Sequence, residues 1–301
     1  MANAQTDFLR FRTLYESDIV KVREYRCCAA RGGPEGEEYS TSNDVVLMRH
    51  GVFCRHSGRH TTTADINQAM FFPQGATYRV SHPADCGDCG TVFTASPNVL
   101  AEILCDCDAS ICDSPAPSFP FLNGPCGSDA FWRHHELVRK IKVARDSVES
   151  IQVDVTALQL IAGVTEAAFE RYNDSRKPRR STTVTDHADR TEAAKCWLAN
   201  RLSQRITLGD VAHSVQLSPF HFARMFQRQT GVPVYGYLTW LRLRTSIERL
   251  ADGERDLTQL ALDLGFSSHS HFSDSFRREF GRTPSDARDA LSSRTIREMS
   301  K

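Results

Sequence analysis

The chain has 301 residues, 40% hydrophobic and 25% charged, which is typical of a globular protein with two domains. No apolar run approaches the roughly 18 residues of a membrane-spanning helix, and the first residues lack the basic and apolar segments of a signal peptide. These features argue against an integral membrane protein and a secreted one, so we expect a soluble, cytoplasmic protein with no membrane partner.

The formal net charge is zero, with 37 Lys and Arg against 37 Asp and Glu, but the charges are unevenly distributed. Residues 1–175 hold 16 basic and 23 acidic side chains, a difference of −7, whereas residues 176–301 hold 21 and 14, a difference of +7. A clustered basic excess is the electrostatic footprint of nucleic-acid binding. The asymmetry therefore predicts that nucleic acid contacts the C-terminal part.

The N-terminal part has the pattern of a compact β structure. One or two strands are expected within residues 7–25. Short apolar runs then follow, separated by Gly, Pro, Ser and Asp, at residues 45–48, 51–54, 68–72, 77–80 and 91–93. Closely spaced short strands of this kind indicate a small β-barrel or sandwich.

After Phe131 the apolar residues recur at helical spacing. Trp132, Leu137 and Ile141 predict one helix, and residues 155–169 predict a second, which is unusually apolar. This second helix either covers the barrel or forms a dimer seam through residues 158–169, and the sequence leaves both interpretations open. Residues 172–183 form a polar, basic, proline-containing run that is typical of an exposed linker.

The most informative feature is a repeat in the C-terminal part. Residues 221–231 are echoed by residues 271–281 at an offset of 50, and both copies contain the pattern His-Phe-x-x-x-Phe. Upstream, residues 208–212 are echoed by residues 257–261 at an offset of 49. The second copy therefore contains one extra residue between its two repeated segments, 257–261 and 271–281.

Each copy predicts a helix-turn-helix unit. Gly265 marks the turn of the second copy, and Ser218 and Ser268 stand where a helix N-cap is expected. Because each pair of phenylalanines is four residues apart, Phe222 with Phe226 and Phe272 with Phe276 should face inward. The opposite faces are mostly small, polar or cationic, which suits a helix laid in the major groove of DNA. With the two caps, the candidate DNA-binding residues are Ser218, Phe220, Ala223, Arg224, Gln227, Ser268, His269, Ser270, Ser273, Asp274 and Arg277.

Residues 190–290 resemble the DNA-binding domain of AraC/XylS-family transcriptional regulators. The resemblance is carried by ITLGDVA (206–212), LSPFHFARMF (217–226), YLTWLRLR (237–244) and GFSSHSHFSDSFRREFGRTP (265–284). Residues 44–92 resemble the cupin-like sensor domain of that family more loosely, chiefly in FFPQGATYRVSHP (71–83).

The resemblance implies seven helices in the C-terminal domain, with a long helix at about residues 234–250 joining the two units. The stripe of this helix that we expect to be buried consists of Tyr237, Leu238, Leu241, Ile247 and Leu250. A rigid connector would let the two recognition helices enter successive major-groove segments, roughly 34 Å apart, on one face of the duplex.

Among the candidates, Arg224 is expected to read guanine, because an arginine can pair with that base through two hydrogen bonds. Ser218 and Ser268 are expected to contact phosphates in addition to capping their helices. Asp274 departs from the family pattern, in which a basic residue is common at this position. A carboxylate repels phosphate, so Asp274 is expected to orient Arg277 or Arg278 instead, or to accept from a base amine.

The ten cysteines are unusually crowded for a chain without a signal peptide. A reducing cytosol argues against a disulfide framework. Cys86 with Cys89, followed by Cys105 with Cys107, could supply four thiolates to zinc or another soft metal, or could act as a thiol sensor. The alternative is that these are small structural thiols, and both interpretations stay open.

Two enzymatic alternatives are considered and not adopted. A metal-dependent cupin needs a histidine pair on one strand face, but His56 and His60 are four residues apart, and Tyr78 occupies the place of the later histidine. His82 is interpreted as a capping or packing residue. DNA repair through a methyl-accepting thiol would require four cysteines near the N-terminus, where only Cys27 and Cys28 occur.

We therefore expect an α+β chain of two domains and no enzyme. Residues 1–175 form a cupin-like sensor and dimerisation domain, residues 176–189 a linker, and residues 190–301 a tandem helix-turn-helix DNA-binding domain. The expected function is sequence-specific transcriptional regulation, as an activator that responds to a small effector. The alternative is a thiol- or metal-responsive regulator that uses the cysteine cluster. The expected partners are double-stranded promoter DNA, RNA polymerase, a small effector and a second copy in a homodimer, with no cofactor.

Overall fold

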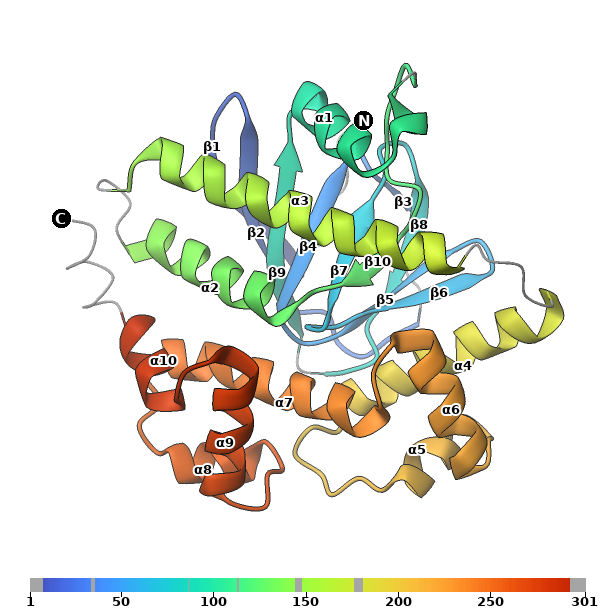
Figure 1. Cartoon of the computed structure of the whole chain (residues 1–301), viewed down its shortest axis with the longest axis vertical. Coiled ribbons are helices and arrows are strands. Elements are labelled where there is room, and N and C mark those ends of the chain that lie inside the picture. The colour runs from blue at the N-terminus through green and yellow to red at the C-terminus, as the bar shows by residue number, and fades with distance from the viewer. Residues whose placement is uncertain are drawn as a thin grey trace.

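The structure, a computed structural model, describes residues 8–33, 36–85, 87–112, 114–143, 148–175 and 181–292. Its N-terminal part is built of two β-sheets with helices packed against them, and its C-terminal part is entirely helical (Figure 1). The expected α+β class with an all-helical C-terminal domain is confirmed.

The larger sheet has six strands in the order β1-β2-β9-β4-β7-β10, and the smaller has four in the order β3-β8-β5-β6. Strands of both sheets line one cavity through Val46, Val92, Phe53 and Val80, so the sheets enclose a shared interior. The strands are β1 (Leu9–Glu16), β2 (Val20–Cys27), β3 (Glu38–Tyr39), β4 (Asp44–His50), β5 (Phe53–Ser57), β6 (His60–Ala64), β7 (Gln68–Phe72), β8 (Thr77–Ser81), β9 (Asp88–Ala95) and β10 (Asn123–Pro125).

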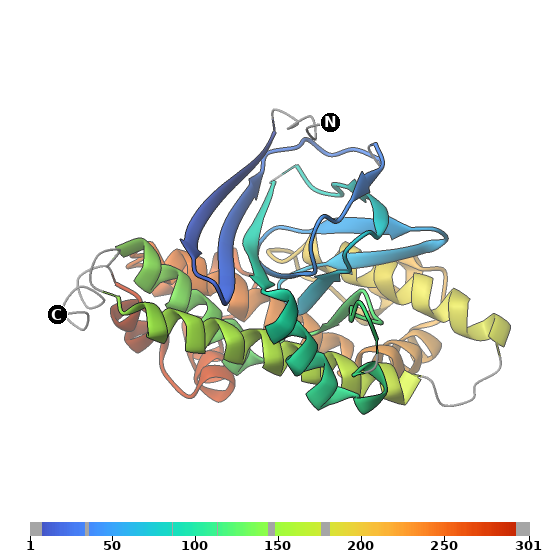
Figure 2. The same cartoon turned by 90° about the horizontal axis from the view of Figure 1, so that it is seen from above.

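Strand β7 is buried at all five of its residues, which explains its continuous apolar pattern. One face of the larger sheet points into the shared interior, and helices cover its other face. These are α2 (Ser128–Val143) and α3 (Ser150–Ser175), with α1 (Pro97–Cys107) packed against α3. Figure 2 shows α1 and α3 along one side of the strands.

Helix α3 covers the sheet, which decides between the two interpretations of the apolar segment 158–169. Leu160, Ile161, Val164, Ala168 and Phe169 are all buried within the chain. Glycine 124 on β10 lies so close that a Cβ there would be 2.4 Å from the Cβ of Ala168. The apolar residues of this segment are therefore occupied by the core, and a dimer seam would have to use other residues of the helix.

The C-terminal part consists of α4 (Ser181–Ala199), α5 (Leu208–Ser214), α6 (Pro219–Thr230), α7 (Val234–Ala251), α8 (Leu257–Asp263), α9 (His269–Phe280) and α10 (Pro284–Ala290). These seven helices of the described residues match the number that the family resemblance implies. Of the expected linker, residues 176–180 lie outside the described residues, and residues 181–189 form the first part of α4.

Helix α7 is the connector between the two helix-turn-helix units, and it is buried on more than one side. Tyr237, Leu238, Leu241, Ile247 and Leu250 are buried as expected, but so are Arg242, Arg244 and Ser246. The helix contacts α4, α6, α9 and α10 as well as strand β4. It therefore joins the DNA-binding units to each other and to the β structure.

The contact between α7 and the β structure is polar and specific. The hydroxyl of Tyr237 donates to the Asp65 carboxylate at 2.7 Å, and the Asn67 amide donates to the Tyr237 carbonyl at 3.1 Å. About two turns further along α7, Arg244 donates to the carbonyl of Ile66 at 3.2 Å. The segment between β6 and β7 is thus hydrogen-bonded directly to the connector.

A second polar group ties the far end of α7 to the larger sheet. Glu248 lies 3.2 Å from the Arg49 guanidinium and 3.5 Å from the His135 ring. Burial alone would raise the pKa of Glu248, but the His135 hydrogen bond and the Arg49 charge hold it well below its usual range. Helix α4 is also attached to β6, because the Thr63 amide donates to the Glu192 carboxylate at 2.7 Å.

The turns of the two units differ by the one residue that the repeat offset predicts, since residues 215–218 connect α5 to α6 and residues 264–268 connect α8 to α9. At offset 49, Gln216 corresponds to Gly265, and both adopt a positive φ, 57° and 77° respectively. The turns also differ in the space around them. A Cβ at Gly265 would lie 2.6 Å from Nη2 of Arg242 and 2.7 Å from the Leu202 carbonyl oxygen.

Replacing Gly265 with alanine is therefore expected to destabilise the chain by roughly 2 kcal/mol or more, from left-handed strain and a steric clash. The matched control is Gln216→Gly, which relieves strain but loosens the unfolded chain, so it should stay within about 1 kcal/mol of the parent. Urea denaturation followed by circular dichroism measures both. Equal stability of the two variants would show that the second turn is not tightly packed.

Asp65 makes the junction between the β structure and α7 sensitive to pH. Burial raises its pKa to about 6, although the hydrogen bond from Tyr237 opposes the rise. Between about pH 4 and pH 6 the folded protein keeps a proton that the unfolded chain releases, so stability falls as pH rises through this window. Since one pKa unit corresponds to roughly 1.4 kcal/mol, the loss is on the order of 3 kcal/mol.

Asp65→Asn should remove this contribution while preserving the size of the side chain. The free energy of unfolding, measured in urea at pH 5 and pH 8, is expected to fall less between these pH values in Asp65→Asn than in the parent. Asp85→Asn, at a carboxylate that accepts from the exposed Arg31 amide, serves as the charge control and should behave like the parent. Parallel pH dependence in Asp65→Asn and the parent would show that Asp65 is not the responsible group.

Candidate functional site

The two recognition helices, α6 and α9, begin and end in the same way. The Ser218 hydroxyl accepts from the His221 amide at 3.4 Å, and the Ser268 hydroxyl accepts from the His271 amide at 3.2 Å. Each helix has 12 residues and ends at a glycine with a left-handed φ, which satisfies its last carbonyls. The predicted N-caps are confirmed, and the caps fix the same length and direction in both copies.

The orientation of each helix about its axis is set by its phenylalanine pair. Phe222 and Phe226 have ring centroids 5.6 Å apart, and Phe272 and Phe276 have centroids 5.7 Å apart. All four side chains are fully buried. The predicted inward direction of both pairs is confirmed, so the opposite face of each helix points outward.

The outward faces carry the candidate DNA-binding residues. Ala223 and Ser273 are half-buried, and the others are exposed: Ser218, Phe220, Arg224, Gln227, Ser268, His269, Ser270, Asp274 and Arg277. Phe220 is 73% exposed, an unusual position for a large aromatic ring in the absence of a partner. The two units lie at opposite ends of α7 (Figure 1), so neither outward face is covered by the other unit.

Local contacts orient some of these side chains. The Arg224 guanidinium lies 5.5 Å from the centroid of the Phe220 ring, and the Ser273 hydroxyl lies 3.3 Å from Nε2 of His269. Among the ion pairs of the described residues, none joins Asp274 to Arg277 or Arg278. The expectation that Asp274 orients one of these arginines therefore has no support in the free protein.

Sequence reasoning missed the cavity of about 240 Å³ between the two sheets. Its walls are mainly apolar and aromatic, and include Phe53, Phe72 and Tyr78. Arg23 and Asp44 form an ion pair of 3.1 Å on one side of it. These residues come from five different strands, so no local motif could have indicated the cavity.

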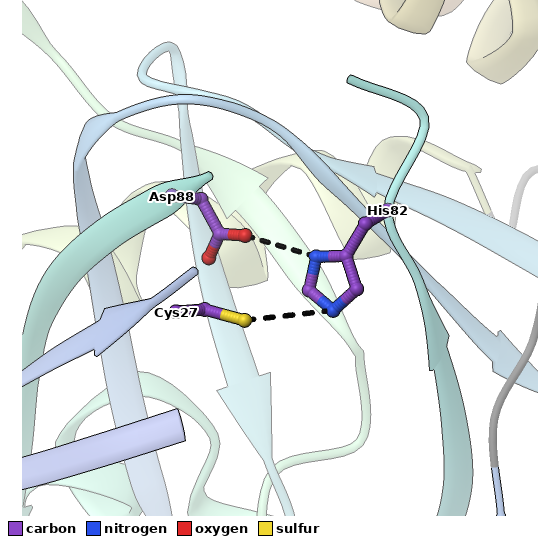
Figure 3. A group of neighbouring side chains, drawn as sticks. All are labelled: Cys27, His82 and Asp88. Carbon is purple, nitrogen blue, oxygen red and sulfur yellow. Dashed lines mark hydrogen bonds and ion pairs between the residues drawn. The ribbon is translucent and has the colours of Figure 1, made fainter. Parts of the chain in front are cut away.

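Cys27, His82 and Asp88 form a second feature that the sequence did not reveal (Figure 3). Cys27 ends β2 and is paired directly with Asp88, the first residue of β9. His82 follows β8 of the other sheet, where its backbone exchanges two hydrogen bonds with Gly32. All three side chains are buried, and all three line the cavity. The interpretation of His82 as only a packing residue is thus incomplete.

The candidate metal ligands of the cysteine cluster are not brought together. Cys89 lies on β9, whereas Cys105 and Cys107 lie on α1, and Cys86 lies outside the described residues. Within the described part of the chain, only Cys27, His82 and Asp88 approach as three potential ligands. A further thiol pair links β5 to α4, because Cys54 and Cys196 hydrogen-bond, which raises the pKa of Cys54 and lowers that of Cys196.

The two histidines considered as cupin metal ligands lie on different strands. His56 is on β5 and His60 is on the adjacent β6, and the His56 ring hydrogen-bonds to Thr61 and Ser81. Among the described residues, no helix is both long and apolar enough to cross a bilayer.

Residues 211–290 match a protein-family model described as a helix-turn-helix domain. The HTH-type transcriptional activator RhaS of Escherichia coli O139:H28 is 34% identical over 113 residues, which cover 38% of this chain and 41% of that protein. RhaS of Escherichia coli O157:H7 is 33% identical over the same length. The match therefore spans about two fifths of these curated relatives.

Solved structures add weaker likenesses. ToxT from Vibrio cholerae O395, in complex with (E)-4-(8-methylnaphthalen-1-yl)but-3-enoic acid, covers 91% of this chain and 99% of its own, at 15% identity and a TM-score of 0.37. The C-terminal domain of AraT, a response regulator from Geobacillus stearothermophilus, covers 33% of this chain and 84% of its own, at 26% identity and a TM-score of 0.32. TM-scores this low carry no inference of shared function.

The family assignment depends on the C-terminal domain. The repeated units have matching caps and turns and buried phenylalanine pairs, and they fall within the stretch that the helix-turn-helix family and the RhaS activators share. The C-terminal part of this chain is therefore an AraC-type helix-turn-helix domain, similar to that of the RhaS transcriptional activators.

Proposed function

We propose that the chain is a sequence-specific DNA-binding transcriptional regulator that acts as an activator and responds to a small effector. The observation that carries this proposal is the pair of recognition helices, whose polar faces are exposed while their phenylalanines are fully buried. The matched relatives are transcriptional activators, which supports activation rather than repression.

The two helices supply different chemistry to the major groove. Arg224 on α6 is exposed beside the Phe220 ring, and such a guanidinium can pair with N7 and O6 of guanine. The face of α9 offers shorter groups, among them His269, Ser270 and Ser273. The basic excess of residues 176–301 supplies the phosphate attraction that positions both helices.

Ser218 and Ser268 each occupy an exposed N-cap at the start of a recognition helix. Helix N-termini attract anions, so a phosphate beside each cap would fix how deeply the helix enters the groove. The domain boundaries after residues 175 and 189, the homodimer and the contact with RNA polymerase belong to the same proposal.

The cavity between the sheets supports the effector part. At about 240 Å³ it suits a compound smaller than a typical drug. The β structure that encloses it is hydrogen-bonded to α7 through Asp65 and Asn67, and it forms an ion pair with α7 through Arg49. An effector that moves these strands would therefore act on the helix that holds both recognition helices.

Arg224→Ala tests the groove assignment. A binding site is first selected from random duplexes with the full chain, and equilibrium binding is then measured at low salt. Loss of a guanine contact should weaken binding by roughly 5- to 150-fold and relax the preference at one base pair. Arg10→Ala removes an equal charge from an exposed position on β1 and should leave binding unchanged. Unaltered affinity and preference in Arg224→Ala would refute the assignment.

A further inference from the structure

We infer that Cys27, His82 and Asp88 form a nucleophilic site in the wall of the cavity, and that Cys27 captures small α,β-unsaturated carbonyl compounds as thioether adducts. The role of this site in sensing an effector rests on the proposed function. Capture itself requires no DNA, so the two proposals can fail separately.

The three side chains are arranged in the order of a nucleophile, a base and a group that orients the base (Figure 3). The Cys27 sulfur lies 3.7 Å from Nε2 of His82, and Nδ1 of His82 lies 3.0 Å from the Asp88 carboxylate. Cys27, His82 and Asp88 are only 4%, 6% and 4% exposed. The sulfur is thus shielded from bulk water but not from the cavity that it lines.

Asp88 determines which nitrogen of His82 faces the sulfur. An ionised carboxylate can only accept, so Nδ1 donates its proton to Asp88 and Nε2 is the nitrogen that shares a proton with the sulfur. The hydrogen bond to Asp88, followed by that to Cys27, raises the pKa of His82 to about 10. His82 is therefore an imidazolium at neutral pH, with its second proton on Nε2 beside the sulfur, and the reacting form of the pair is a thiolate next to this imidazolium.

The proposed reaction is an addition in which nothing leaves. The Cys27 sulfur forms a bond to the β-carbon of the conjugated alkene, whose π bond breaks. The proton on Nε2 of the His82 imidazolium passes to the α-carbon of the resulting enolate, which leaves the ring neutral. No oxidant or reductant is consumed, and the product is a saturated carbonyl compound joined to the protein through a thioether.

The cavity accounts for the class of compound. Its apolar and aromatic walls favour a small, mainly uncharged molecule, and its volume of about 240 Å³ limits the size. Tyr39 and Phe11 line the cavity and are also 53% and 46% exposed, so they mark its mouth. A reactive thiol at the inner wall would thus select compounds that first fit the cavity.

The test measures which cysteine reacts with but-3-en-2-one, supplied below one equivalent to the full chain. A Cys28→Ser background leaves Cys27 as the single thiol of its tryptic peptide. The exposed Cys112, isolated by a second digestion that cleaves before Asp108 and Asp113, serves as the internal reference. We expect Cys27 to react at least tenfold faster than Cys112. A slower reaction at Cys27 than at Cys112 would overturn the proposal.

Asp88→Asn separates a built site from an isolated thiol. An asparagine has no charge to stabilise the His82 imidazolium, and its amide can donate to Nδ1 of a neutral ring, so the sulfur would remain a thiol instead of a thiolate. Cys27 should then react at least tenfold more slowly, with Cys112 unchanged. Asp85→Asn, at the nearby carboxylate that accepts from the Arg31 amide, should change neither rate. An unchanged Cys27 rate in Asp88→Asn would overturn the proposal.

Two further measurements keep the test decisive. If Asp88→Asn does not fold, as judged by its thermal midpoint, His82→Gln replaces it and must give the same tenfold loss. Zinc analysis of protein purified without chelator covers the alternative use of the same groups. If the parent holds one equivalent of zinc and Cys27→Ser holds none, the three residues form a metal site and the nucleophilic site is refuted.

Discussion

The burial of α7 is the constraint on which the rest of the structure depends. A helix at the surface of a protein normally exposes its polar side to solvent. In α7, however, Arg242 and Arg244 are buried along with the leucines. Arg242 donates to the carbonyls of Leu202 and Gln204 in the segment before α5, and Arg244 donates to the carbonyl of Ile66 and the hydroxyl of Ser128. Each guanidinium therefore holds a different part of the chain against one rigid helix.

This arrangement gives the recognition helices a fixed relation to the β structure. The first unit is held through α4, whose Glu192 binds Thr63 of β6, and the second is held through α2, where the Trp132 ring lies 4.0 Å from the Arg282 guanidinium. A change inside the barrel can thus reach the helix-turn-helix units through polar contacts that include those of Asp65, Arg49 and Thr63. Such contacts have discrete partners, so they suit a two-state response better than apolar packing does.

The sequence predicted the C-terminal domain almost completely, because its information is local. Caps, turn residues and phenylalanine pairs lie within 15 residues of one another, and the repeat showed each of them twice. The N-terminal strands at residues 45–48, 68–72 and 91–93 were also predicted. Strands β3 and β10 and the trio of Cys27, His82 and Asp88 were not, because they depend on pairings between distant residues. Strand β6 and helix α1 were also not predicted, although β6 pairs with the adjacent β5 across a two-residue turn and α1 begins with a local Ser96-Pro97 signal. The crowding of cysteines pointed to Cys86, Cys89, Cys105 and Cys107, whereas the group of potential ligands among the described residues consists of Cys27, His82 and Asp88.

The central claim is that α7 presents α6 and α9 to one face of the duplex, and hydroxyl-radical footprinting tests it most directly. On a selected binding site, the account predicts two protected segments whose centres are about 10 base pairs apart, which is one helical turn. A single protected segment, or two segments on opposite faces of the duplex, would contradict it.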